Sequence, residues 1–372
     1  MKKKIWRYFV VLGVIAGMLL PVAGCGKEGQ AGDVSTADQG NSGGPVGNGQ
    51  TDVKFGLILP TEGLGDKNFC DMGYEGLLMA QKDFGIEFTY AEPKSVSDYE
   101  AAFRMYAESG EYELILGLGS GQSDAMTAVA SEFPDQKFGI VDSQVDMSNV
   151  SCYSTKWPEQ TFLCGVLAGL GTLDDRFEKA NEENVVGAIL GADYPSLRSG
   201  VVGFEAGVRY VNPDCEVLSA VVGDFNDPAK GKEVSLSMYK RGADFIQQIA
   251  GATGLGLFSA AKEADRYAIG VGKSQSYIEP DYIIATSVGN VHLMIYNEIK
   301  TTLDGTWEPG VHNWGIKEDA VGFSNEDSNI TIPEDVLAVI EEIKGKVSSG
   351  ELIPPSTEEE LDEWLTQHQY SK

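Results

Sequence analysis

Lys54-Phe-Gly-Leu-Ile-Leu-Pro60 is a short apolar run that ends at a proline, and the unit that it opens decides the fold. A turn marked by Gly or Pro and then an amphipathic segment follow it, and this order recurs along the chain from residue 53 onward. Runs that are almost continuously apolar are typical of strands buried on both faces of a parallel sheet. Their alternation with helical segments indicates βαβ units.

The repeated unit predicts ten strands in two series. The first series is Lys54–Pro60, Glu87–Pro93, Leu114–Gly119, Lys137–Ser143 and Val150–Thr155. The second series is Val185–Ala192, Glu216–Gly223, Phe245–Ala250, Tyr267–Gly272 and Tyr282–Val288. Two such series predict an α/β fold with two doubly wound, Rossmann-like lobes. Ligands of such sheets bind beyond the carboxyl ends of the strands.

Helix signals lie between these strands. Ser97 and Asp98 precede a predicted helix at Tyr99–Ser109, and Pro228 opens another that reaches Arg241. The polar segment 331–372 contains a charged amphipathic helix at Pro333–Val347 and then a final acidic helix. We expect this tail to pack on the lobes and not to form a domain.

The first 24 residues have the order of a secretory signal peptide. A basic start at Lys2, Lys3, Lys4 and Arg7 precedes the apolar run Phe9–Leu20. A transmembrane anchor is the alternative, but the run is shorter than the ~20 residues that span a bilayer. Val22-Ala-Gly-Cys25 closes the run and resembles the bacterial lipobox. That resemblance implies that Cys25 is lipidated and becomes the mature N-terminus.

The segment at residues 25–52 predicts a flexible tether. After Cys25 it consists mainly of Gly, Ser, Gln, Asn and Asp, with almost no apolar side chains that could form a core. A lipidated cysteine followed by a tether would hold a soluble body at the extracellular face of the bacterial cell membrane.

Charge and cysteine usage exclude several classes of function. The formal net charge is −28, and a body this acidic would be repelled by phosphate backbones, so nucleic acid is excluded as a partner. The remaining cysteines have no metal-type spacing and no readable disulfide pairing; they are Cys70, Cys152, Cys164 and Cys215. The three histidines have no metal-like neighbours. We expect no metal and no cofactor.

A glycine-rich run offers the main alternative among functions. Leu114-Ile-Leu-Gly-Leu-Gly-Ser-Gly121 follows a strand, and Asp142 ends the next strand, as in a nicotinamide-binding fold. The third glycine of that fingerprint is replaced by Gln122, which disfavours this interpretation. We expect instead a tight turn at Ser120 whose backbone faces the cleft, and a similar turn at Gly251. No catalytic motif is present, so we expect no enzyme.

Several longer motifs resemble the basic membrane protein (Bmp/PnrA-like) lipoproteins, which are substrate-binding components of ABC importers for purine nucleosides. The resemblance runs in consistent order from residue 54 to about residue 350. It rests on Gly65-Asp-Lys-Asn-Phe69, Gly73-Tyr-Glu-Gly76, Lys137-Phe-Gly-Ile-Val-Asp142, Gly203-Phe-Glu-Ala-Gly-Val-Arg-Tyr-Val-Asn-Pro-Asp214, Phe225-Asn-Asp-Pro-Ala-Lys-Gly-Lys232 and Ala250-Gly-Ala-Thr-Gly-Leu-Gly256.

The resemblance implies a type I periplasmic-binding fold, in which two lobes joined by a hinge close on the ligand. It implies that Phe69 and Phe225 stack on the two faces of a purine, and that Asp142 accepts from a ribose hydroxyl. Gly251 matches a close backbone approach. We expect Asp142, Glu62 and the backbone groups near Ser120 and Gly251 to supply polar contacts to the ligand. Trp157 and Trp307 are expected near the hinge or surface and outside the site.

Other positions depart from the family pattern. The base-reading Asp falls on Thr61 or Glu62, and Cys70 replaces the Asn after the first stacking Phe. Gly272 replaces a second ribose carboxylate. A family lysine is missing at Gly289-Asn290, and we expect Lys273 to restore a charge nearby. These changes leave two ligand classes open: a nucleoside held by altered polar contacts, or another small planar molecule.

We therefore expect a lipid-anchored, monomeric solute receptor whose partners are a small-molecule ligand, the permease of an ABC importer and the membrane. Lobe 1 is expected at 53–157 plus 287–312, and lobe 2 at 158–286 plus 313–330. Two other functions stay open. The same fold can serve as a ligand sensor or surface receptor for a non-nucleoside ligand, or, less favoured, as a nucleoside-processing enzyme.

Overall fold

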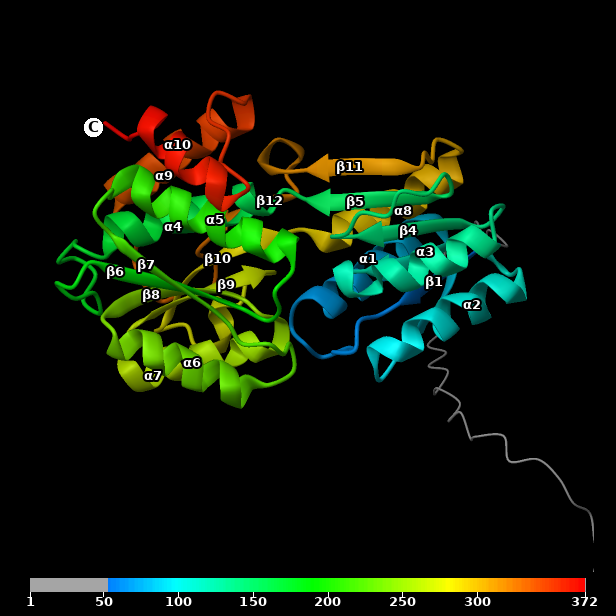
Figure 1. Cartoon of the computed structure of the whole chain (residues 1–372), viewed down its shortest axis with the longest axis horizontal. Helices are drawn as coiled ribbons and strands as arrows, with labels where there is room; N and C mark the ends of the chain where they lie inside the picture. The colour runs from blue at the N-terminus through cyan, green and yellow to red at the C-terminus, as the bar shows by residue number, and fades with distance from the viewer. Residues whose placement is uncertain (1–52, 372) are drawn as a thin grey trace, which may run out of the picture. The chain divides into compact units, whose positions relative to one another are not determined.

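The computed structural model describes residues 53–371 and builds them around two six-stranded sheets (Figure 1). Each of the ten predicted strands is confirmed, with ends that differ by at most two residues. The signal peptide, Cys25 and the tether lie outside the described residues. None of the helices within 53–371 has the length and apolar character needed to cross a membrane.

The first sheet is parallel throughout. Its strands lie in the order β2, β1, β3, β4, β5 and β11. Their bounds are β2 (Glu87–Ala91), β1 (Lys54–Ile58), β3 (Tyr112–Leu118), β4 (Lys137–Val141), β5 (Val150–Thr155) and β11 (Gly310–Trp314). The short edge strand β11 was not predicted, because its side chains alternate between exposed and half-buried and form no apolar run.

The second sheet repeats this order with one change. Its strands are β7 (Glu216–Val221), β6 (Val185–Leu190), β8 (Ala243–Ile249), β9 (Tyr267–Gly272), β10 (Ile283–Gly289) and β12 (Val321–Ser324). Only β12 is antiparallel to its neighbour. In both sheets the first five strands have the 2-1-3-4-5 order of a doubly wound fold. The predicted α/β class with two Rossmann-like sheets is thereby confirmed.

Helices cover both faces of each sheet, so each sheet has two hydrophobic clusters. On the first sheet, α1 (Phe69–Phe84) pairs with α8 (Val291–Asp304), and α2 (Tyr99–Ser109) with α3 (Ser123–Glu132). On the second, α4 (Trp157–Gly171) pairs with α5 (Pro195–Val211), and α6 (Pro228–Lys240) with α7 (Leu255–Ala264). The tail helices α9 (Glu334–Ser349) and α10 (Glu358–Gln367) contact α4 and α5.

The chain passes between the two sheets three times. It leaves the first sheet after β5 through α4, returns after β10 through α8, and leaves again between β11 and β12. The lobe boundaries expected after residues 286 and 312 fall inside β10 and β11. Because these connections follow the carboxyl ends of β5, β10 and β11, the ends of both sheets are tied to one another where ligands of such folds bind.

Candidate ligand-binding site

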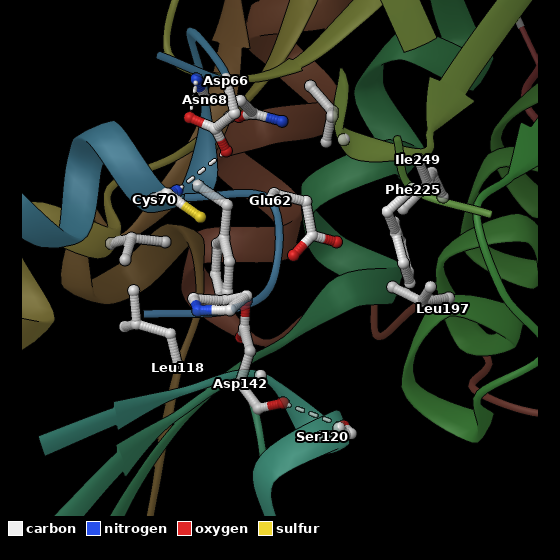
Figure 2. Close-up of a pocket in the computed structure, with 18 of the residues that line it drawn as sticks. Glu62, Asp66, Asn68, Cys70, Leu118, Ser120, Asp142, Leu197, Phe225 and Ile249 are labelled. Atoms are coloured by element: carbon white, nitrogen blue, oxygen red, sulfur yellow. Dashed lines mark hydrogen bonds between the residues drawn. The ribbon is translucent and has the colours of Figure 1, made fainter. Parts of the chain in front are cut away.

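One cavity, with a volume of about 180 Å³, is lined by residues that follow the carboxyl ends of strands in both sheets. This size suits one small molecule. Nine of the predicted site residues line it: Thr61, Glu62, Phe69, Cys70, Ser120, Asp142, Phe225, Gly251 and Gly272. Figure 2 shows several of these side chains around the same space.

Phe225 lies in the loop between β7 and α6, and both the backbone N–H and the side-chain hydroxyl of Thr253 form hydrogen bonds with this loop. The carbonyl oxygen of Phe225 accepts from the backbone N–H of Thr253 at 2.8 Å. The hydroxyl of Thr253 donates to the carbonyl of Asp224 and accepts from the N–H of Asp227, each at 2.8 Å. The Asp227 carboxylate caps α6 by accepting from the N–H of Lys230 at 2.9 Å. The motif at residues 225–228 thus fixes the backbone that carries the ring.

The Phe225 ring packs on glycine backbone and is accompanied by a second ring. A Cβ atom on Gly191, just after β6, would lie only 2.3 Å from the ring, so the ring needs a glycine there. Tyr194 lies nearly parallel to Phe225, with 6.4 Å between ring centroids and 16° between planes, and both line the cavity. The second sheet therefore supplies an aromatic wall made of Phe225 and Tyr194.

Phe69 is the first residue of α1, and Asp66 caps that helix. The buried Asp66 carboxylate accepts from the backbone N–H groups of Asn68, Cys70 and Asp71 at 2.9 to 3.2 Å. These contacts satisfy donors at the helix start that would otherwise lack partners. The Phe69 ring is half-buried and lines the cavity, so it faces the space that Phe225 faces from the other sheet.

Three carboxylates line the cavity, and burial raises the pKa of each. The Asp142 pKa rises to about 6, although Oδ1 accepts from the N–H of Thr155 at 2.9 Å. Burial also raises the pKa of Asp66, against the effect of its three backbone donors. The Glu62 pKa is raised first by burial and further by the negative charges of Asp66 and Asp224. In Figure 2 the Glu62 side chain lies between Cys70 and Phe225.

No Lys, Arg or His side chain is among the described residues that line the cavity. Lys273, which we expected to restore a charge near the ligand, does not line the cavity: its ammonium group is exposed and pairs with Glu75 at 2.8 Å. An anionic group on a ligand would therefore meet like charges with no compensating cation. The cavity is suited to a neutral or cationic ligand that donates hydrogen bonds.

Ser120 and Thr61, two of the expected polar positions, form hydrogen bonds within the protein, and Gly251 packs against an aromatic ring. The Ser120 hydroxyl donates to the carbonyl oxygen of Asp142 at 3.1 Å, which ties the two strand ends together. Gly251 has a left-handed φ of 55°, and a Cβ atom on it would meet the Phe225 ring at 3.4 Å, so this backbone lies close against the ring. Thr61 donates its backbone N–H elsewhere, to the hydroxyl of Tyr99 at 2.9 Å.

Sequence reasoning missed several lining residues. Trp157 lines the cavity, which corrects the expectation that it lies outside the site, whereas Trp307 does not line it. Tyr194 and Asn68 are also in the lining, as is the exposed side chain of Val96. Tyr194 lies in the turn between β6 and α5 and directly precedes the proline that starts α5. This position after the carboxyl end of a strand is the feature of the sequence that could have identified it as a site residue.

Comparisons with known proteins place the chain in one family. Residues 54–356 match the family described as ABC transporter substrate-binding protein PnrA-like. The ABC transporter nucleoside-binding protein BmpA of Lactococcus lactis is 29% identical, over 84% of this chain and 92% of the relative. The CD4+ T-cell-stimulating antigen of Listeria monocytogenes is 30% identical, over 82% of this chain and 88% of the relative.

Solved structures share the fold. An ABC transporter solute-binding protein of Aeropyrum pernix K1 superposes with a TM-score of 0.75 at 27% identity, covering 85% of this chain and 98% of that structure. A sugar transporter protein of Clostridium phytofermentans has a TM-score of 0.55 at 15% identity, covering 74% and 99%, and shows likeness of fold alone. The expected type I periplasmic-binding fold is thus confirmed. The chain belongs to the Bmp family of PnrA-like ABC transporter substrate-binding proteins.

Proposed function

We propose that this protein binds a purine nucleoside outside the cell and delivers it to the permease of an ABC importer when its two halves close on the ligand. The observation that carries the proposal is one cavity with Phe69 on the first-sheet side, Phe225 on the second-sheet side, and three carboxylates without a cation among the described lining residues. The protein acts as a monomer held on the membrane by a lipid on Cys25.

The two phenylalanine rings supply affinity for a flat ring system. Each stacking contact between a base and an aromatic side chain contributes about 1–3 kcal/mol in proteins that bind bases. Phe69 belongs to α1 and Phe225 to the loop before α6, so a ligand between them contacts both halves and favours their closure. This arrangement gives the permease a closed form that differs from the empty one.

The acidic lining selects the polar part of the ligand. Ribose hydroxyls and ring or exocyclic N–H groups can donate to Asp142 and Glu62, and such hydrogen bonds would compensate the burial of these carboxylates. A phosphate ester would bring a negative charge to the same groups. We therefore expect nucleosides to bind and nucleotides to be rejected. The relative from Lactococcus lactis, named as nucleoside-binding, supports the same ligand class.

Thermal unfolding of the purified chain with inosine, adenosine, guanosine, hypoxanthine and inosine 5′-monophosphate tests the proposal. A nucleoside at 100 times its dissociation constant should add about 2.7 kcal/mol of stability. Inosine 5′-monophosphate is the matched control, because it has the same base and sugar but carries a phosphate. No shift with any nucleoside, or an equal shift with the monophosphate, would refute the proposed function.

Membrane attachment has a separate test. Cys25→Ser in the full chain, expressed in a bacterial host, should move the protein from the membrane fraction to the soluble fraction, because the acyl chains can no longer be attached. A Cys215→Ser variant is the control, since that cysteine lies in the folded body. A Cys25→Ser protein that stays in the membrane fraction would contradict the lipid anchor.

A further inference from the structure

The Asn68 side chain is a buried amide without a hydrogen-bond partner among the described residues. Asn68 is only 5% exposed and lines the cavity, but only its backbone is hydrogen-bonded: its N–H donates to Asp66, and its carbonyl oxygen accepts from the N–H of Met72. A buried amide that makes no hydrogen bond is costly, because it has lost its water and gained nothing in return. In Figure 2 it lies beside Asp66, in the same cavity wall.

The helix start explains why this amide is free. Asn68 occupies the N-cap position of α1, where an Asn side chain ordinarily accepts from the first backbone N–H groups of the helix. Asp66 already accepts from Cys70 and Asp71, so no capping hydrogen bond to the Asn68 side chain forms. The donor and acceptor of the amide thus remain available to a ligand.

Gly272 provides the room that the amide occupies. This glycine ends β9 with a left-handed φ of 85°, and a Cβ atom on it would lie 1.9 Å from Asn68 Oδ1 and 2.9 Å from Met72 Cε. Real Cβ atoms do not come this close to other atoms, so any side chain at position 272 would displace the amide. Asn68 precedes α1 on the first-sheet side and Gly272 ends β9 of the second sheet, and both line the cavity.

We propose that Asn68 is a specificity-determining residue, which binds a neutral ligand group carrying a hydrogen-bond donor and an acceptor side by side, and that Gly272 makes its position possible. This inference rests on the proposed function, since it concerns the polar contacts of the same ligand. An amide both donates and accepts, whereas the ionised carboxylates of Glu62, Asp66 and Asp142 only accept. Asn68 therefore adds a side-chain donor to a wall of acceptors.

Inosine binding to the purified full chain, measured by isothermal titration, tests the inference. Asn68→Ala should weaken binding about tenfold, the effect of losing one or two uncharged hydrogen bonds. Asn68→Asp keeps the shape and the acceptor but removes the donor, and it should weaken binding at least as much. Asp66 still caps α1 in both variants, so the melting temperature of Asn68→Ala should stay close to that of the wild type, whereas Asn68→Asp adds a carboxylate beside the buried Asp66 and should melt lower at neutral pH.

Gly272→Ala should also weaken inosine binding, because its methyl group displaces the amide. Gly110→Ala is the matched control: that glycine also has a left-handed φ, 64°, but no atom lies within 4 Å of a Cβ there, so only backbone strain is added. Because Asn68→Ala removes the amide, adding Gly272→Ala to that variant should change affinity much less than it does in the wild type.

The outcomes separate the two proposals. If the wild type binds inosine and Asn68→Ala binds it within twofold as tightly, Asn68 only packs, and this inference is overturned while the proposed function stands. If Gly272→Ala leaves affinity unchanged, the steric role of Gly272 is overturned. If neither inosine, adenosine, guanosine nor hypoxanthine binds the wild type, the proposed function is overturned, and this inference is overturned with it.

Discussion

The two sheets have the same strand order but contribute different chemistry to the cavity. The first-sheet side supplies all three of the lining carboxylates, Glu62, Asp66 and Asp142. The second-sheet side supplies three rings, glycine backbone, aliphatic side chains and the polar side chains of Gln160 and Ser196. The rings are those of Trp157, Tyr194 and Phe225, and the described lining residues on this side include no ionisable group other than the Tyr194 hydroxyl. The carboxylates thus all come from one half, whereas each half contributes an aromatic ring, Phe69 from the first and Phe225 from the second.

This division shows how one architecture can be specialised without a change of topology. Doubly wound sheets place their variable loops at the same edge, so each half can alter its loops independently. In the proposed complex, closing the two halves on the ligand would exclude water, which strengthens the hydrogen bonds that the ligand makes.

The two halves also differ in how they bury an acid away from the cavity. Asp244 in β8 of the second sheet accepts from the Thr172 hydroxyl and from the N–H of Asn181, and its pKa is raised by burial to about 7. Glu298 on α8 is also fully buried, but neither carboxylate oxygen has a hydrogen-bond partner of normal geometry in the described structure. Burial raises its pKa to about 8.

The largest expected effect comes from Glu298→Gln. A folded-state pKa of about 8 against an ordinary value of 4.5 means that the contribution of Glu298 to stability is fully present below pH 4.5 and is lost as pH rises from 4.5 through 8. The loss is up to about 1.4 kcal/mol per pH unit. Glutamine does not titrate, so at pH 9 the free energy of unfolding of the variant should exceed that of the wild type by several times that amount. Urea unfolding of both proteins at pH 5 and pH 9 measures this difference.

Asp244→Asn sharpens this comparison. The Asp244 carboxylate is hydrogen-bonded, and the amide of the variant can keep only part of that network. We therefore expect a smaller gain in the free energy of unfolding at pH 9 than for Glu298→Gln, again measured by urea unfolding.

The Glu298 prediction has a clear contrary outcome. If the stability of the wild type and that of Glu298→Gln depend on pH in the same way between 5 and 9, Glu298 does not titrate in this range.

Asp142→Asn should have opposite effects on binding and stability. Inosine affinity should fall by about 1.5–3 kcal/mol, because an acceptor with a full charge is lost. Without ligand the variant should melt higher at pH 8 and the same at pH 3, since the raised pKa of about 6 means that the ionised wild-type carboxylate is destabilising above that pH. Calorimetric melting at both pH values and titration with inosine measure the two effects. A variant with unchanged affinity would remove Asp142 from the polar side.

Phe225→Ala and Phe69→Ala test the two aromatic rings, one from each half of the molecule. Each should weaken inosine binding by about 1–3 kcal/mol, the contribution of one stacking contact. Tyr277→Ala is the control, because this aromatic side chain is 53% exposed and does not line the cavity. Quenching of intrinsic Trp fluorescence on titration provides the measurement. If one Phe variant binds like the wild type, the ligand is stacked from one side only.

The smallest expected effect is that of Lys273→Ala. Its ion pair with Glu75 links the two halves, but both groups are exposed, and exposed pairs contribute about 0.2–1 kcal/mol. Inosine affinity should change less than twofold, and Glu75→Ala should behave the same way. A tenfold loss confined to Lys273→Ala would show that the lysine reaches the ligand after all.

The sequence alone determined the architecture, because strands buried on both faces must be nearly continuous in apolar residues. Val150–Thr155 and Tyr267–Gly272 were predicted with the same bounds that the structure has. The resemblance to the Bmp family singled out Phe69, Asp142 and Phe225, and their positions in turns or at strand ends fitted a cleft, since turns after such strands collect at one edge. The strand β11 gave no comparable signal, because an edge strand buries too little surface to need an apolar run.

Only the tertiary structure decided the contacts across the cavity. Asn68 and Gly272 are more than 200 positions apart in sequence, and nothing local indicates that a side chain on one would occupy the place of the other. Lys273 was expected in the site from its position next to Gly272, but a side chain one residue further along points elsewhere and reaches Glu75. Local sequence fixes where a backbone turns, whereas the direction and partners of a side chain depend on what the other sheet places opposite it.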